Sequence, residues 1–313
     1  MSTTRVHGSI GKSIHGNIRK YYGLLTVICV ILGFTFPQFS VLSPYVPVLL
    51  AILVFSMVIE HSIGDFTRIV NHPRKILALT VSNLILYPVI GILFSYFFLP
   101  SQDIYVGIIL LCFAPSPVVA ALWTELSNGD GAISVTTALF SMMLSIIVYP
   151  IILYFMGIAS PDLAISIFKL LALSIFVPAV IALFLRLEEE KYVPAKNTIT
   201  LLSSFVGLFI IIVAIAHMAS NLISNEFSLI LLIGFLVVIL LVAGFAYGYI
   251  LGKFLKVKKK DSIAFLYSSS MRDGIIPLSV AITYFSANAT VASTILLIIM
   301  PFLVVGVYYM VRK

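Results

Sequence analysis

The sequence predicts an all-α integral membrane protein with about ten transmembrane helices. Hydrophobic residues make up 61% of the 313 residues and charged residues only 10%, whereas a soluble domain carries about 25% charged residues. The mean hydropathy is +1.16. Apolar stretches of about 17–25 residues recur along the whole chain, and each is long enough to cross a bilayer as a helix.

The predicted spans follow one another with short connections. They lie near residues 21–37, 44–63, 75–98, 102–126, 132–156, 162–185, 198–220, 227–252, 261–285 and 290–311. Basic residues gather in residues 1–20, 65–75, 186–196 and 253–260, whereas the alternate loops near 38–43, 99–101, 157–161, 221–226 and 286–289 contain no Lys or Arg. Since Lys and Arg mark the cytoplasmic side, both termini are expected in the cytoplasm of a multi-pass cell-membrane protein. The net charge of +7 is therefore read as topology and not as nucleic-acid binding.

The chain is predicted to contain two five-helix repeats of opposite orientation, residues 21–157 and 158–313, after the cytoplasmic tail of residues 1–20. His61 in VIEHSIGDF and His217 in AIAHMASNL fall at matching places, and APSPVVAALW (114–123) corresponds to MRDGIIPLSV (271–280). Both members of the second pair carry helix breakers. Interrupted spans at corresponding positions of two halves are typical of a transporter site near the middle of the membrane.

The breakers explain why a hydrophobic segment can hold polar groups. Pro115 and Pro117 lack a backbone N–H and disfavour a continuous helix, and Gly274 and Pro277 do the same in span nine. Helix ends at such a break favour an anion at the positive end, and exposed carbonyls favour a cation or a hydroxyl donor. The alternative is that the prolines only kink structural helices.

Arg272 lies about half-way along span nine, too deep to reach the membrane surface easily. A buried arginine needs a counter-charge, and the two candidates are the adjacent Asp273 and a bound anionic substrate. Asn83, Ser141 and the serines before Arg272 could line the same cavity or could only pack between helices. The residues predicted to bind substrate are Asn83, Pro115, Ser116, Pro117, Ser141, Ser268, Ser269, Ser270, Arg272 and Asp273.

Other classes of function find little support in the sequence. There is no cluster of metal ligands, no glycine loop for a nucleotide and no nucleophile–base set, so we expect no metal, no cofactor and no enzymatic activity. The expected partners are a small-molecule substrate and the lipid bilayer, but not nucleic acid, and the oligomeric state is left open.

Three segments resemble a known family. Residues 49–75 (LLAILVFSMVIEHSIGDFTRIVNHPRK) resemble the second span and following loop of the bile acid:sodium symporter superfamily. Residues 114–130 (APSPVVAALWTELSNGD) and 267–282 (YSSSMRDGIIPLSVAI) are similar to the fourth- and ninth-span motifs of its arsenical-resistance, or arsenite efflux, permease branch. The resemblance implies ten helices in inverted repeats and a panel domain packed on a core domain. In that core domain the fourth and ninth helices unwind and cross.

The sequence departs from the resemblance at the positions that would carry chemistry. Ser116 stands where the arsenite branch has a functional cysteine, and Ile275 stands where it has an acidic residue. The positions that hold sodium ligands in the bile acid branch are Ala120, Ala121, Ser268 and Arg272, with Asn83 as the one plausible polar replacement. A fixed positive charge repels Na⁺, so sodium coupling is not expected.

The predicted function is secondary transport of a small organic anion or oxyanion-like solute by alternating access, without sodium. Protons, acting through Asp273, are the candidate coupling ion. Arsenite or antimonite efflux and sodium-coupled symport of the bile-acid type are the alternatives. A membrane sensor or an intramembrane enzyme is the alternative from a different class of function. The sequence shows neither the attached soluble domain that a sensor would usually carry nor the catalytic residues that an enzyme would need.

The basic-residue pattern makes a prediction about topology. Single cysteines introduced near residues 71 and 258 should react with an impermeant thiol reagent only from the cytoplasm, and those near 160 and 287 only from outside. Labelling of residues 160 and 258 from the same side would contradict the ten-span arrangement.

Overall fold

The computed structural model describes residues 24–60, 73–98, 102–188, 196–221 and 227–311, and all regular secondary structure in these ranges is helical. The predicted tail, residues 1–20, and His61 lie outside the described residues. The first helix is Leu24–Thr35. It is followed by η1 (Pro37–Tyr45), α2 (Val46–Glu60), α4 (Pro73–Phe98), α5 (Gln102–Cys112), α6 (Val119–Leu126), α7 (Gly131–Phe155), α8 (Pro161–Leu171), the π-helical turn η2 (Ala172–Phe176), α9 (Val177–Glu188), α10 (Lys196–Asn221), α11 (Phe227–Phe254), α12 (Lys259–Ser270), α13 (Ile275–Tyr284), η3 (Ala287–Thr290) and α14 (Val291–Val311).

Seven helical segments within the described ranges are long and apolar enough to cross a membrane. They are Pro37–Ile59, Pro73–Phe98, Gly131–Phe155, Pro161–Arg186, Leu201–Ser220, Ser228–Phe254 and Ala287–Val311. Three further predicted spans correspond to the short helix Leu24–Thr35 and to the interrupted pairs α5/α6 and α12/α13, whose halves are too short to cross alone. The ten-span, two-repeat arrangement therefore stays a prediction.

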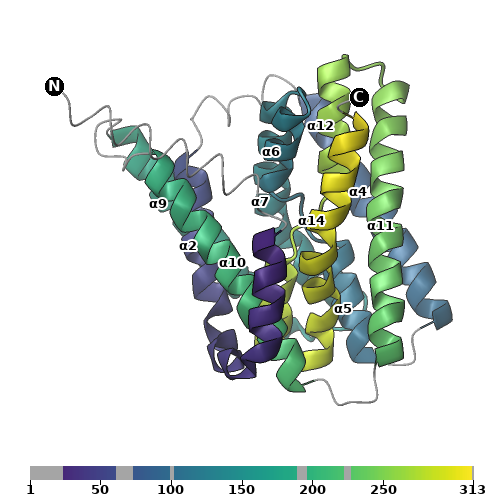
Figure 1. The fold of residues 1–313 in the computed structure, drawn as a ribbon. Coiled ribbons are helices and arrows are strands. Elements are labelled where there is room, and N and C mark those ends of the chain that lie inside the picture. The colour runs from purple at the N-terminus through teal and green to yellow at the C-terminus, as the bar shows by residue number, and fades with distance from the viewer. Residues whose placement is uncertain (1–23, 61–72, 99–101, 189–195, 222–226, 312–313) are drawn as a thin grey trace.

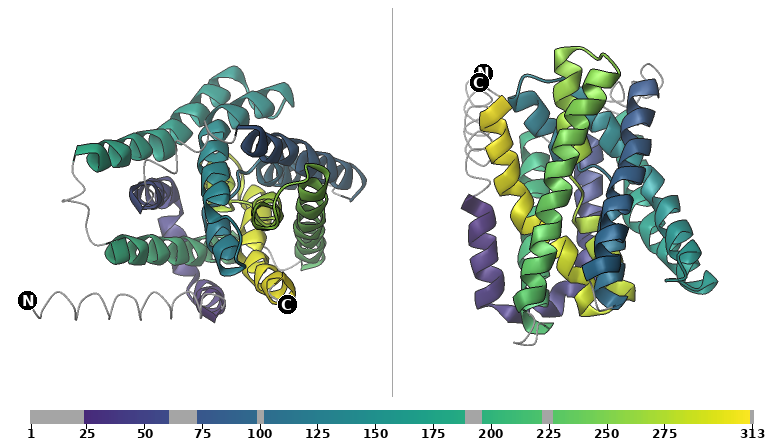
Figure 2. Two further views of the ribbon diagram at one scale, coloured as in Figure 1. Left: turned by 90° about the horizontal axis from the view of Figure 1, so that it is seen from above. Right: turned by 90° about the vertical axis from the view of Figure 1, so that its right-hand side faces the viewer.

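The helices form two groups that lie side by side. In one group α2 packs on α9, α10 and η2, α8 joins this group through its contacts with η2, and α10 also packs on η1. The other group contains α4, α5, α6, α11, α12 and α14, in which α11 contacts α4, α12 and α14. Figures 1 and 2 show α2, α9 and α10 together on one side and α4 and α11 on the other. The helix α7 contacts α6 in the second group and also α8, so it connects the two groups.

The helix α13 lies between the groups. It contacts α2 and α8 on one side and α5 and α14 on the other. Its C-terminal Tyr284 donates its hydroxyl hydrogen to the carbonyl oxygen of Ser166 on α8, at 2.9 Å. Its partner α12 packs instead on α11, α6, α7 and α4, so the two halves of this interrupted span have different neighbours.

A stripe of glycines brings α11 close to α12. Gly244, Gly248 and Gly252 follow at every fourth residue and therefore share one face of α11. A Cβ atom on Gly248 would lie 2.5 Å from the carbonyl oxygen of Phe265, and one on Gly244 would lie 2.6 Å from the Cα of Ser270. Small residues at this spacing let helix backbones approach closely in membranes, where apolar burial does not drive helix association.

Side chains of α4 run alongside α12 and bind it at three levels. Near the start of both helices the Lys75 ammonium forms an ion pair of 2.6 Å with the buried Asp261 carboxylate. Further along, the Asn83 amide donates to the carbonyl oxygen of Ser268 at 3.0 Å, and the Tyr87 hydroxyl donates to that of Ser270 at 2.6 Å. The last carbonyls of α12, which a helix end leaves without intrahelical donors, are thus partly satisfied by α4.

The close approach of α11 and α12 makes a prediction about stability. Gly248→Ala should lower the melting temperature of the purified protein, because its Cβ would meet backbone atoms that cannot move aside; overpacking of this kind costs about 1–3 kcal/mol. Gly306→Ala is the matched control, since a Cβ there meets no atom within 4 Å and alanine favours a helix by about 0.5–1 kcal/mol over glycine. Equal melting temperatures for the two variants would contradict the tight packing.

Candidate functional site

Two unwound segments interrupt the helices where the sequence predicts breaks. One is residues 113–118, between α5 and α6, and the other is residues 271–274, between α12 and α13. The first contains Pro115 and Pro117, which cannot donate backbone hydrogen bonds. In the second segment the break lies earlier in the sequence than expected, since it ends at Gly274 and does not reach Pro277. Pro277 lies in the first turn of α13, where the missing N–H removes no helical bond.

The two unwound segments bind each other. The backbone N–H of Asp273 donates to the carbonyl oxygen of Pro115 at 2.8 Å, and the Arg272 guanidinium donates to that of Ala114 through Nη1 at 3.2 Å. Both carbonyls belong to buried residues. Because a bilayer supplies no donors, a carbonyl freed by a helix break must find a partner within the protein or in a water-filled cavity.

Arg272 is buried, with 2% of its surface exposed. Besides its bond to Ala114, its Nη2 donates to the carbonyl oxygen of Asn83 at 3.4 Å, and its guanidinium carbon lies 3.6 Å from the centre of the Tyr87 ring. Carbonyls and an aromatic face stabilise a cation but leave its full charge in place. Among the described residues, no acidic side chain forms an ion pair with Arg272.

The Asp273 carboxylate binds backbone N–H groups and does not form a salt bridge with Arg272. Its Oδ1 accepts hydrogen bonds from the backbone N–H groups of Ile275, at 2.8 Å, and Ile276, at 3.1 Å. This is how an N-cap residue satisfies the free donors at the start of a helix. The adjacent acid therefore caps α13, and the positive charge of Arg272 is left for another partner.

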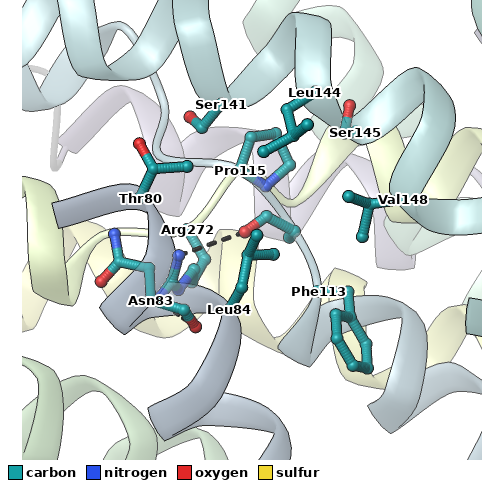
Figure 3. A pocket seen from close by; sticks show the side chains of 11 residues that line it. Thr80, Asn83, Leu84, Phe113, Pro115, Ser141, Leu144, Ser145, Val148 and Arg272 are labelled. Carbon is teal, nitrogen blue, oxygen red and sulfur yellow. Dashed lines mark hydrogen bonds between the residues drawn. The ribbon is translucent and has the colours of Figure 1, made fainter. Parts of the chain in front are cut away.

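A pocket lies beside Arg272, between α4, the first unwound segment and α7. It is lined by Thr80, Asn83, Leu84, Phe113, Ala114, Pro115, Ser141, Leu144, Ser145, Val148 and Arg272, and about 10 Å³ of it is open to a water-sized molecule. Figure 3 shows Thr80, Asn83, Ser141 and Arg272 on one side of the view and Phe113 and Val148 on the other. Most of the polar side chains and the positive charge thus lie on one side of the pocket, while Ser145 lies near Val148 on the other (Figure 3).

The structure brings some of the predicted site residues together around this pocket, and others do not line it. Asn83, Pro115, Ser141 and Arg272 line it. Ser116 is one residue further on, and its backbone N–H donates to the Ser141 hydroxyl at 3.2 Å. Ser268, Ser269, Ser270, Pro117 and Asp273 do not line it; the first and third serines offer their carbonyls to α4. Whether any of these residues binds substrate stays a prediction.

Several buried polar atoms near the breaks have no hydrogen-bond partner among the residues that the structure describes. Among pocket residues these are Thr80 Oγ1, Asn83 Oδ1 and Arg272 Nε, and close by are Ser116 Oγ, Ser268 Oγ and Ser269 Oγ. A buried polar atom without a partner costs about 1–3 kcal/mol. The set holds donors and acceptors, so a small polar molecule entering the pocket could bind several of them.

Tyr87, Thr80 and Ser145 were missed by sequence reasoning. A signal was present in the spacing: Thr80, Asn83 and Tyr87 follow at three and then four residues, which places them on one face of α4. Ser141 and Ser145 are likewise four residues apart on α7. Polar residues repeating at helical spacing within an apolar span mark an inward face.

The capping role of Asp273 leads to a prediction. Asp273→Asn should fold almost normally, because an asparagine oxygen can also accept from the first N–H groups of α13. Asp273→Ala should destabilise the protein by about 1 kcal/mol, as expected for the loss of a cap. Melting temperatures of the two variants decide the matter: a large loss in Asp273→Asn would show that the carboxylate charge is needed and that it neutralises Arg272 after all.

Comparison with known proteins agrees with a transporter. Residues 47–226, more than half of the chain, match the model of the sodium bile acid symporter family. The chain is also 24% identical over 281 residues to a Bacillus subtilis (strain 168) protein described as "Uncharacterized sodium-dependent transporter YocS", an alignment that covers 88% of this chain and 85% of that protein. A transporter family fits a multi-pass helical chain with two broken spans around a polar pocket, and this chain belongs to the sodium bile acid symporter family.

Proposed function

We propose that this membrane transporter is a secondary transporter that moves a small organic anion or oxyanion-like solute by alternating access between the two helix groups. The proposal includes a position in the cell membrane with both termini in the cytoplasm. The observation that carries it is the buried Arg272, which lines the pocket and forms no ion pair with a described acidic residue. A buried charge of this kind calls for a counter-charge, and an anionic substrate supplies one.

The dimensions of the pocket favour a small solute. About 10 Å³ of it is open to a water-sized molecule, which is close to the room that one water needs, so the lining helices would have to move apart for even a small solute to enter. Thr80, Asn83 and Ser141 place hydroxyl and amide groups beside the guanidinium, and these can hydrogen-bond the remaining oxygens of a carboxylate or oxyanion. The apolar residues Phe113, Leu144 and Val148 can contact a short hydrocarbon part of such a solute.

The two alternatives are less favoured by the same residues. Arsenite efflux would rely on a thiol where this chain has Ser116, whose hydroxyl is buried and does not line the pocket. Sodium coupling would place a cation near carbonyls that Arg272 and the Asp273 N–H occupy. The term "sodium-dependent" in the name of the Bacillus subtilis relative describes that protein. Proton coupling through Asp273 remains a hypothesis, since that carboxylate caps α13.

The proposal is tested by screening small carboxylates, oxyanions, bile acids and arsenite for thermal stabilisation of the purified protein. A ligand at about 100 times its Kd stabilises the folded state by about 2.7 kcal/mol. We expect a small anion to do so, and Arg272→Gln to weaken its binding more than tenfold, or about 1.4 kcal/mol. Lys169→Gln is the control: it removes the same charge from an exposed position on α8 and should bind as the wild type does.

Uptake of the same anion into proteoliposomes should agree within about twofold between Na⁺ and choline buffers, a difference of about 0.4 kcal/mol. Stabilisation by arsenite alone would favour the efflux alternative. A tenfold requirement for Na⁺ would contradict sodium independence, and unchanged anion binding in Arg272→Gln would contradict the assigned role of Arg272.

A further inference from the structure

The carbonyl oxygens at the first break already accept hydrogen bonds from the second unwound segment. Ala114 and Pro115 are consecutive residues, and their carbonyl oxygens accept from the Arg272 side chain and the Asp273 N–H, which are also consecutive. In secondary transporters, unwound carbonyls and half-helix ends commonly coordinate the coupling cation. Here a covalently attached cation and a backbone amide bind those oxygens.

The guanidinium also binds a third element. It donates to the Asn83 carbonyl and lies on the Tyr87 ring, and both of these residues belong to α4. The same two side chains donate to the Ser268 and Ser270 carbonyls at the end of α12. A planar guanidinium with several fixed donors can bridge two carbonyls and keep a ring against its face, which a lysine ammonium cannot do equally well.

The Tyr87 hydroxyl also lies against α11. A Cβ on Gly244 of α11 would lie 2.1 Å from the Tyr87 hydroxyl oxygen, so α11 contacts that hydroxyl directly. The ring beneath Arg272 has 1% of its surface exposed. Arg272 is therefore positioned by α4, α11 and the first unwound segment together.

We propose that Arg272 is a built-in cation, a positioning residue whose guanidinium holds the two unwound segments and α4 together at the place where a coupling cation would otherwise bind backbone carbonyls. This goes beyond a contact with substrate, because the role does not depend on a bound substrate. It rests on the proposed function only in explaining sodium independence, and its test uses no substrate, so the two proposals can fail separately.

The test is chemical rescue of a variant that lacks the cation. Arg272→Ala, in the full-length protein and without substrate, should melt at a lower temperature than the wild type. Guanidinium chloride at about 10 mM, far below denaturing concentrations, should restore at least half of the loss. Urea at the same concentration has nearly the same shape but no charge, and should restore none of it. Lys169→Ala should respond to neither compound.

The prediction that no sodium ion binds at these carbonyls is tested on the wild type. Its melting temperature should agree within about 1 °C in sodium, potassium and choline chloride, since a ligand that binds only the folded state would raise it. Specific stabilisation by sodium would overturn the proposal. An unchanged melting temperature in Arg272→Ala, or equal rescue by urea and guanidinium, would also overturn it, because the side chain would then only fill space.

A second pair of variants decides the matter if Arg272→Ala does not fold. Tyr87→Phe keeps the ring beneath the guanidinium and loses only the bond to Ser270, whereas Tyr87→Leu loses both. We expect Tyr87→Leu to melt clearly below Tyr87→Phe. Equal melting temperatures would show that the ring does not support a cation, and would overturn the proposal.

Discussion

The mutual hydrogen bonding of the two unwound segments is the constraint on which the rest of the molecule depends. Broken helices inside a bilayer expose carbonyls that lipid cannot satisfy. In this chain the carbonyls of Ala114 and Pro115 find their donors in Arg272 and Asp273. Each break therefore makes the other possible, although more than 150 residues separate them in the sequence. The prolines create the free carbonyls of the first segment, and Arg272 and Asp273 in the second segment supply the donors for them.

The surrounding helices are built to keep this meeting point in place. The glycine stripe on α11 allows α12 to approach closely, and side chains of α4 bind α12 from its start at Asp261 to its end at Ser270. The C-terminal end of α12, directly before the unwound residues 271–274, is thus held in place by α4 and α11. On the far side of the break, Asp273 caps α13 and gives that helix a defined beginning. Arg272 lies between two well-determined ends.

Much of this could be predicted from the sequence. The helical class, the places of the seven long spans and both breaks follow from hydropathy and from the breakers Pro115, Pro117 and Gly274. The depth of Arg272 follows from its place within an apolar run. The partners could not be predicted, because a helix face gives a direction but no neighbour: nothing in the sequence shows that Tyr87 lies under Arg272 or that Ser268 and Ser270 face α4. Asp273 was a plausible partner for Arg272, but a carboxylate beside a helix start also satisfies backbone donors.

The position of α13 between the two helix groups has a mechanical consequence. The helix before the break, α12, is attached to α11 and α4, while the helix after it, α13, contacts α2 and α8 of the other group and is joined to α8 through Tyr284. Residues 271–274 therefore connect two helices that pack on different helix groups. Any rotation of one helix group against the other would change the backbone angles of residues 271–274. It would also change the distances that Arg272 spans, and since Arg272 lines the pocket, one side chain would connect the occupancy of the pocket with the angle between the two helix groups.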